Sequence, residues 1–226
     1  MSRPYRALYD FFAHPRGVAP SWYVLPFQGR EGDARSSGVG FKMVRYTDDM
    51  VVMCCTIEEA QAALAMIWEW MEGNGLSLNE EKSQVVDMSQ YNSYFDFLGY
   101  RFKRTKRGLN KYVRPKSKQK LRQNFKPRTK RCNGKSLEEI CQIINPTLRG
   151  WYGYFKHAHH TELQAVDSWV RGRLRSILRK RRGGRGRGRG TDHYRWRNHY
   201  FTELGLFSLK DALNIEIASL RNGAKC

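Results

Sequence analysis

The sequence predicts an α+β chain in two parts, an antiparallel sheet with one packed helix and then a mainly α-helical part. Two apolar segments, 41–46 and 50–56, predict a pair of short strands. Apolar residues at helical spacing over 60–71 predict one amphipathic helix directly after them. Charge divides the chain as well, because residues 1–100 have a net charge of −5 and residues 101–226 have a net charge of +25. The predicted strands and this helix lie in the acidic part, and the rest of the chain is a basic module.

Two adjacent acids, Asp48 and Asp49, stand between the predicted strands and so at the tip of a hairpin. Neighbouring carboxylates repel each other unless a cation neutralises them, and Mg²⁺ prefers such hard oxygen ligands. A pair of these ions can stabilise the attacking and leaving oxygens of a phosphoryl transfer. The alternative is that the two acids only form the turn, a position in which aspartate is common.

Composition limits the class of protein. With 226 residues and 40% hydrophobic side chains, the chain can bury a core. It has no apolar run of membrane-spanning length, no apolar leader at its start, and five cysteines without Cys-X-X-Cys spacing. These features predict no membrane partner. They also predict a soluble, intracellular protein with free thiols, cytoplasmic in a bacterium or, as the alternative, organellar.

The first 40 residues show no regular pattern of secondary structure. Four prolines and a Gly/Ser-rich stretch over 29–40 predict irregular structure for residues 1–40.

The helix after the hairpin has clear signals at both ends. Thr56 and Glu59 form a capping box before it, and Gly73 ends it. A polar turn over 79–82 and a returning strand over 83–88 are expected next, which places the helix on one face of the sheet.

Three segments of this part resemble reverse transcriptases. Tyr46-Thr47-Asp48-Asp49 is similar to their Tyr-X-Asp-Asp hairpin, 75–83 to the segment that follows it, and Phe95-Asp96-Phe97-Leu98-Gly99-Tyr100 to their primer-grip hairpin. The resemblance implies that Asp48 and Asp49 are catalytic and bind Mg²⁺, and that Lys82 protonates the pyrophosphate leaving group. It also implies four substrate- and primer-binding residues: Tyr46, Phe97, Leu98 and Gly99. The alternatives are a solvated turn lysine at position 82 and strand core at 98–99.

The basic part is expected to be helical. Helices are predicted over 116–125, from a capping box at Ser136 to just before Pro146, and over 162–182. The alternating Arg/Gly run 183–190 cannot build a core and predicts a flexible cationic linker, followed by a short last helix that Ser208 caps. A field of this sign attracts polyanions, so a nucleic acid is the expected partner.

The segment 144–155 restricts the resemblance to one class of reverse transcriptases. It includes Asn145-Pro146-Thr147-Leu148-Arg149-Gly150-Trp151 and resembles the signature of the maturase-specific (thumb, or X) domain of group II intron reverse transcriptases. The resemblance implies an undefined N-terminal segment (1–40), a partial reverse-transcriptase palm (41–112), a helical thumb (113–182), the linker (183–199) and a C-terminal helical element (200–226).

The same resemblance implies the partners of the basic part. These are group II intron RNA and a template-primer duplex, with a DNA target as a further candidate. Seven cations of the thumb are the expected RNA-binding residues: Lys118, Arg122, Arg149, Arg171, Arg175, Arg179 and Arg182.

The family's chemistry uses a third carboxylate from an upstream strand. Asp10 and Asp33 are the upstream aspartates, and neither stands in an apolar strand pattern. We therefore expect an incomplete two-metal Mg²⁺ site in an N-terminally truncated chain, inactive as a polymerase alone unless a second chain supplies the fingers and upstream palm.

Two functions are thus predicted from the sequence. The first is an RNA-directed DNA polymerase of a mobile intron that also assists splicing. The alternative is a non-catalytic maturase-type RNA-binding fragment. A third hypothesis, an unrelated basic DNA-binding protein, explains the charge but not the ordered motifs.

Overall fold

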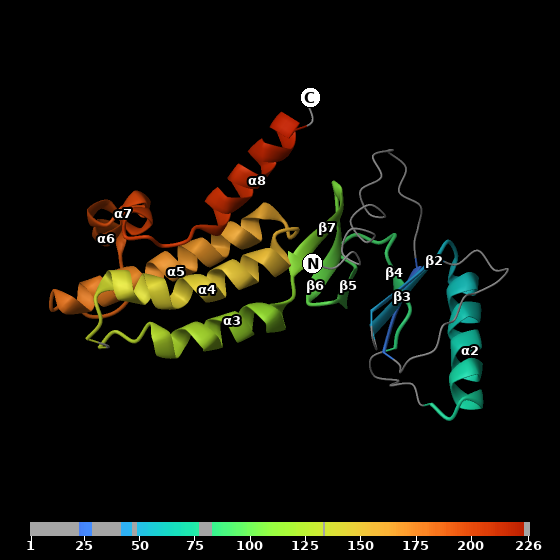
Figure 1. The fold of residues 1–226 in the computed structure, drawn as a ribbon. Helices are drawn as coiled ribbons and strands as arrows, with labels where there is room; N and C mark the ends of the chain where they lie inside the picture. Colours follow the sequence, from blue (N-terminus) through green and yellow to red (C-terminus); the bar gives the residue numbers. More distant parts are fainter. Residues whose placement is uncertain (1–22, 29–41, 47–48, 77–82, 133, 224–226) are drawn as a thin grey trace. The chain divides into compact units, whose positions relative to one another are not determined.

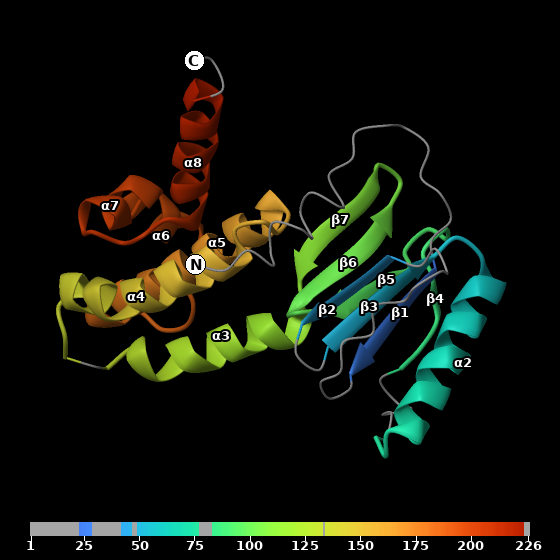
Figure 2. The ribbon, with the colours of Figure 1, turned by 45° about the vertical axis from the view of Figure 1, so that its right-hand side comes forward.

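The computed structural model describes residues 23–28, 42–46, 49–76, 83–132 and 134–223. The chain forms two compact units, residues 1–111 and residues 112–226, which Figures 1 and 2 draw from two sides. Antiparallel sheets and one described helix make up the first unit, and the second is mainly helical. The predicted α+β class is confirmed. No described helix is long and apolar enough to cross a membrane.

The first sheet contains the predicted hairpin. β2 (Lys42–Tyr46) and β3 (Asp49–Cys54) are antiparallel, with Tyr46 directly opposite Asp49. On its other side β3 pairs with β1 (Tyr23–Gln28), and β1 pairs with the short β4 (Val86–Asp87). The strand order is β2-β3-β1-β4. Because β3 is an inner strand and is buried from Met50 to Cys54, its position is well fixed.

One face of α2 (Ile57–Gly73) packs on this sheet. The predicted capping box is present, since Thr56 Oγ1 accepts the backbone N–H of Glu59 at 3.2 Å and the Glu59 carboxylate accepts the backbone N–H of Thr56 at 3.4 Å. The buried residues that join helix and sheet are Met50, Val52, Cys54, Ala60, Ala63 and Met71. This contact supports β3 from one side.

The sequence analysis does not predict β1, because Pro26 lies within it. Proline has no backbone N–H for a ladder hydrogen bond and is normally confined to sheet edges. In the structure β4 pairs with Tyr23 and Val24 of β1. Within the described residues, this pairing ends before Pro26, so the proline interrupts no hydrogen bond between β1 and β4. The expectation of irregular structure is therefore wrong for residues 23–28, and the rest of 1–40 lies outside the described residues.

A second sheet follows, with the strand order β5-β6-β7. Its strands are β5 (Tyr94–Phe97), β6 (Tyr100–Thr105) and β7 (Gly108–Val113). Phe95 and Phe102 are buried and stack with their ring centroids 5.0 Å apart, whereas Arg101 pairs with Asp96 at 2.8 Å. Residues 101–107, which include five cations, belong to β6 and the turn before β7.

Three long helices make up most of the second unit. Both views show α3 (Pro115–Arg128), α4 (Leu137–Phe155) and α5 (His160–Arg181) side by side, each antiparallel to the one before it (Figures 1 and 2). The apolar side chains between them include Leu121, Phe125, Ile140, Ile144, Leu148, Leu163, Leu174 and Ile177, all of which are buried.

The predicted helix end before Pro146 is wrong, because α4 continues through this residue to Phe155. A proline inside a helix removes one backbone hydrogen bond and costs about 3 kcal/mol. Apolar residues on both sides of Pro146 offset that cost, since Ile144 and Leu148 are fully buried on the same helix. Tertiary packing therefore outweighs the local preference.

The predicted Arg/Gly linker lies against the helix that precedes it. Residues 183–189 return along α5, where Arg179 Nε donates to the carbonyl oxygen of Arg185 at 2.8 Å. A Cβ atom at Gly184 would lie 2.7 Å from Cγ of Arg179, so only glycine lets the backbone approach this closely. Three further helices follow, α6 (Gly190–Arg195), α7 (Asn198–Glu203) and α8 (Leu209–Gly223), and α8 is longer than predicted.

Two buried polar side chains fix the segment that leads into α8. Asn145 of α4 donates to the carbonyl oxygen of Gly205 at 2.7 Å and accepts the backbone N–H of Phe207 at 2.9 Å. Asp167 of α5 accepts the backbone N–H groups of Leu209 and Lys210, both at 3.0 Å. A carboxylate at a helix N-terminus satisfies unpaired donors and complements the helix dipole. The predicted cap is present too, as Ser208 Oγ accepts the backbone N–H of Asp211 at 3.3 Å.

Asp167→Ala should lower the free energy of unfolding by about 2–4 kcal/mol, because it leaves the buried N–H of Leu209, the part-buried N–H of Lys210 and the Ser208 hydroxyl without their acceptor. Urea unfolding followed by circular dichroism measures the change. The matched control is Glu203→Ala, which removes an exposed carboxylate of the same unit and should stay within about 0.5 kcal/mol. Equal effects of the two substitutions would contradict the capping role.

Candidate acidic hairpin and RNA interface

The acidic hairpin places Asp49 at the first position of β3. Asp49 is half-buried, and the five residues that follow it in β3 are buried, so its backbone is anchored in the sheet. Tyr46 pairs with Asp49 in the antiparallel register of β2 and β3. Thr47, Asp48 and Lys82 lie outside the described residues.

β1, the strand that pairs with β3 at Asp49, is where a further carboxylate for a metal ion could lie. In the antiparallel register Gln28, the last residue of β1, is the partner of Asp49. β1 has the sequence YVLPFQ and contains no aspartate or glutamate. Asp48 and Asp49 have the hard oxygen atoms that suit Mg²⁺, so they fit a divalent metal in type. Within the described residues, no three His, Cys, Asp or Glu side chains are grouped so as to hold a metal ion.

The predicted primer-grip segment forms a tight hairpin between β5 and β6. Phe97 pairs with Tyr100, and the two residues between them both have positive φ, +49° at Leu98 and +78° at Gly99. Such a turn matches the twist of paired strands and normally takes Asn-Gly or Gly-Gly. A leucine with positive φ is strained, and strain of this kind concentrates at functional sites.

Two of the predicted substrate-binding side chains differ in accessibility. Phe97 is 4% exposed and belongs to the core under the second sheet, so its predicted contact with a primer is wrong for the side chain. It instead fixes the base of the Leu98-Gly99 turn. Tyr46 is 41% exposed beside Asp49 and remains a candidate for substrate contact.

Three of the seven predicted RNA-binding cations are exposed. They are Arg122 on α3, Arg149 on α4 and Arg182 directly after α5. The guanidinium of Arg122 lies 5.9 Å from the centroid of the Trp169 ring, and that of Arg149 lies 5.4 Å from the Phe207 ring. An aromatic face attracts a cation without neutralising its charge, so both groups stay available to phosphates.

Two further predicted cations are half-buried and near carboxylates. Lys118 Nζ lies 2.9 Å from Oε2 of Glu162, which joins α3 to α5. Arg171 lies 4.0 Å from Asp167. These pairs reduce, but do not remove, the positive charge that the two side chains offer to RNA.

Arg175 is the clear correction. Its side chain is 3% exposed, and it donates to the carbonyl oxygen of Trp196 at 3.0 Å and to Oδ1 of Asn198 at 2.9 Å. Burial is the main cause that lowers its pKa, and the neighbouring Arg171 adds to the effect. Arg175 therefore joins α5 to the segment that begins α7 and cannot reach a phosphate.

Arg179 has a similar structural role, because it pairs with Asp192 of α6 at 2.7 Å. Asp192 is buried, and the backbone N–H of Arg189 and the Arg179 guanidinium lower the pKa of its carboxyl group. The positive charge of Arg179 is thus largely neutralised by Asp192. The predicted RNA contact at this position is not supported.

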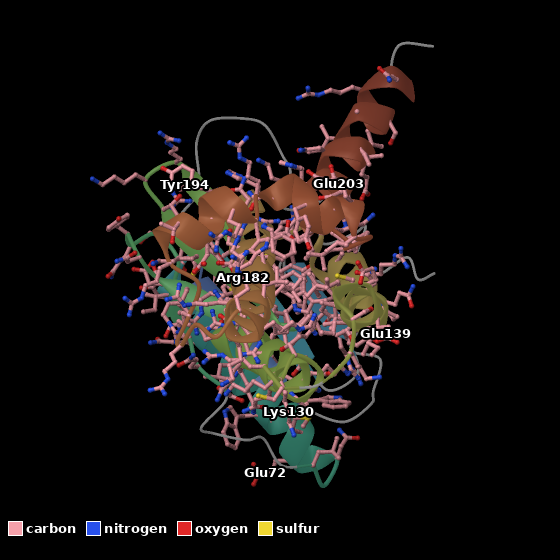
Figure 3. All side chains as sticks on the ribbon, turned by 90° about the vertical axis from the view of Figure 1, so that its left-hand side faces the viewer. Glu72, Lys130, Glu139, Arg182, Tyr194 and Glu203 are labelled. Atoms are coloured by element: carbon pink, nitrogen blue, oxygen red, sulfur yellow. The ribbon has the colours of Figure 1, made fainter. Side chains whose placement is uncertain are left out.

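The structure brings together cations that the sequence analysis did not single out. The end of α3, the connection to α4 and the end of α5 meet at one end of the helical unit, where Arg181 donates to the carbonyl oxygen of Lys135 (Figure 3). Arg173 strengthens this junction by donating to Thr129 Oγ1 at 2.6 Å. We call the exposed cations here the end cluster: Lys126, Arg128, Lys130, Arg131, Lys135, Lys180 and Arg181. Four cations within 126–131 were the available sequence signal.

Comparison with known families agrees with this arrangement. Residues 16–102, which include the acidic hairpin, match the reverse transcriptase (RNA-dependent DNA polymerase) family. Residues 118–196 match the group II intron maturase-specific domain, and this match extends from α3 through the Arg/Gly run to the end of α6. A search of curated proteins gives no match.

The two matches follow each other in the same order as the motifs, one in each structural unit. They imply that the chain binds RNA. The chain belongs to the group II intron reverse transcriptase/maturase family.

Proposed function

We propose that the helical unit binds folded intron RNA through its exposed cations and assists splicing as a maturase. The distribution of exposed charge is the observation that supports this most strongly. Residues 112–226 contain 27 lysines and arginines and 8 aspartates and glutamates. Of these acids, Asp167 and Asp192 are buried, and Glu216 accepts hydrogen bonds from Tyr152 and Lys156. Because these acids neutralise only a few of the 27 cations, the surface keeps a strong positive charge.

The proposed contacts are electrostatic. Arg122, Arg149, Arg182 and the end cluster lie on three helices and their connections, so they can reach several phosphates of one folded RNA. Each neutralised phosphate releases condensed counterions, which makes the affinity fall steeply with salt. Contacts of this kind fix orientation without reading sequence. A template-primer duplex and a DNA target offer the same phosphates and are further proposed ligands.

For the first unit we propose a nucleotidyl-transfer site that this chain does not complete alone. In the proposed reaction the primer 3′ hydroxyl loses its proton to water and its oxygen forms a bond to the α-phosphorus of a nucleotide. The bond from that phosphorus to the bridging oxygen breaks, and Lys82 donates a proton to the leaving pyrophosphate. Asp48 and Asp49 would hold Mg²⁺, which supplies charge stabilisation at the phosphoryl oxygens. Leu98 and Gly99 would support the primer strand.

The register of β1 supports the proposed lack of polymerase activity. The third carboxylate that the family takes from an upstream strand has no counterpart in β1, where Gln28 is the partner of Asp49. Loss of charge that is preorganised for a transition state reduces a rate by orders of magnitude. A second chain that supplies the missing carboxylate, the fingers and the upstream palm is the proposed partner for catalysis.

The triple substitution Arg122→Gln, Arg149→Gln and Arg182→Gln should weaken binding to a group II intron transcript about tenfold or more. It should also reduce the dependence of log K on log[salt] by roughly one unit per lost phosphate contact. Fluorescence anisotropy over a range of salt concentrations measures both quantities.

The matched control for this test is Asp48→Ala with Asp49→Ala, which should leave RNA affinity within about twofold because no cation is removed. An unchanged dissociation constant and salt dependence in the triple variant would contradict the proposed interface. A large loss in the control would instead assign RNA binding to the acidic hairpin.

Primer extension tests the proposal for the first unit. On a poly(rA)/oligo(dT) template with Mg²⁺, the chain should give no more product than its Asp48→Ala, Asp49→Ala variant. A known active reverse transcriptase in the same buffer confirms that the assay works. Extension by the unaltered chain that the double substitution abolishes would show a complete site and refute the proposal.

A further inference from the structure

The Arg/Gly run and α6 together form an exposed surface with one kind of charge. We call this the Arg/Gly surface and define it by six exposed side chains: Arg185, Arg187, Arg189, Tyr194, Arg195 and Arg197. Asp192 is the one acid in the sequence of 183–199, and it is 4% exposed. The charged groups that this segment offers to a ligand are therefore all positive.

Two glycines of the run lie against α5, whereas its arginines are exposed. Gly184 and Gly188 are half-buried and face α5, where a Cβ at Gly188 would lie 3.0 Å from Cβ of Arg175. Arg185, Arg187 and Arg189 are exposed. Glycine thus permits the close approach to α5, and the arginines between the glycines are presented to solvent.

Buried polar contacts fix this surface on its support. Asp192 accepts the backbone N–H of Arg189 at 2.8 Å and pairs with Arg179 at 2.7 Å. Arg175 donates to the carbonyl oxygen of Trp196 at 3.0 Å. Because both ends of α6 are bound to α5 in this way, its backbone needs little ordering when a ligand binds.

Tyr194 is the aromatic residue of this surface. It is 78% exposed, the highest value among the large hydrophobic side chains of the described residues. It stands two positions after the buried Asp192, which is about 200° around a helix and so almost opposite to α5. The faces of its ring are accessible to a flat partner.

We propose that the Arg/Gly surface binds an unpaired segment of RNA, with Tyr194 stacking on a base and the arginines contacting the adjacent phosphates. Exposed aromatic rings beside a cationic track are the combination that recognises single strands, because every base has a face on which to stack. The bases of a duplex are already stacked on each other, so Tyr194 adds nothing to duplex binding. This inference rests on the proposed function, since it assigns one part of the RNA interface to unpaired nucleotides.

The test compares two probes on the full chain. The first is oligo(U) of about 12 nucleotides, and the second is a blunt RNA duplex of about 12 base pairs. Tyr194→Ala should weaken binding to oligo(U) about tenfold and leave duplex binding within about twofold. Tyr194→Phe keeps the ring and should restore oligo(U) binding. Because Tyr194 is exposed, neither substitution removes a core contact, and circular dichroism verifies the fold.

The outcomes separate this inference from the proposed function. Duplex binding together with an unchanged oligo(U) affinity in Tyr194→Ala would overturn the inference alone, and it would leave a protein partner as the ligand of Tyr194. Equal losses for the two probes would also overturn it, since the ring would then not distinguish unpaired bases. If the unaltered chain bound neither probe, the proposed function would fail and the inference with it.

Discussion

The helical unit depends on buried polar contacts that neutralise part of its own positive charge. Asp167 and Asp192 accept hydrogen bonds from backbone N–H groups and lie close to arginines of α5, while Asn145 and Arg175 bind segments that follow α5 in the sequence. A chain with so many cations repels itself, and isolated charges are costly to bury. Each of these contacts therefore fixes a connecting segment and decides which neighbouring cations stay exposed. The surface available to RNA follows from this internal pairing.

Local patterns predicted the parts of the fold that local interactions determine. The acidic hairpin, the capping boxes at Thr56 and Ser136 and the helices over α2 and α5 follow from turn residues, caps and apolar spacing. Three features depend on distant partners and could not be read in this way. α4 continues through Pro146 because of its packing, β1 forms because β3 pairs with it, and the Arg/Gly run is fixed by Arg179 and Asp192.

The candidate sites also combine features that local sequence predicts with features that depend on distant partners. Sequence similarity indicated Asp49 and the Leu98-Gly99 turn, but not that Phe97 is buried or that Gln28 is the partner of Asp49. For α5 the apolar pattern separates a face toward the core from a face toward solvent. Residues 174–177 are nevertheless all buried, because α6 and α7 pack against a second face of this helix. An arginine on that side is indistinguishable in the sequence from one that faces solvent. Composition thus identifies a nucleic-acid-binding protein, and tertiary structure is needed to identify the cations that bind.

We infer that RNA contacts the exposed cations of the helical unit and not the sheets of the first unit. Ultraviolet cross-linking of the chain to a group II intron transcript, followed by mass spectrometry of the cross-linked peptides, tests this inference. We expect cross-links in 116–135 and 180–197, which contain the end cluster and the Arg/Gly surface. Cross-links confined to 42–111 would contradict it.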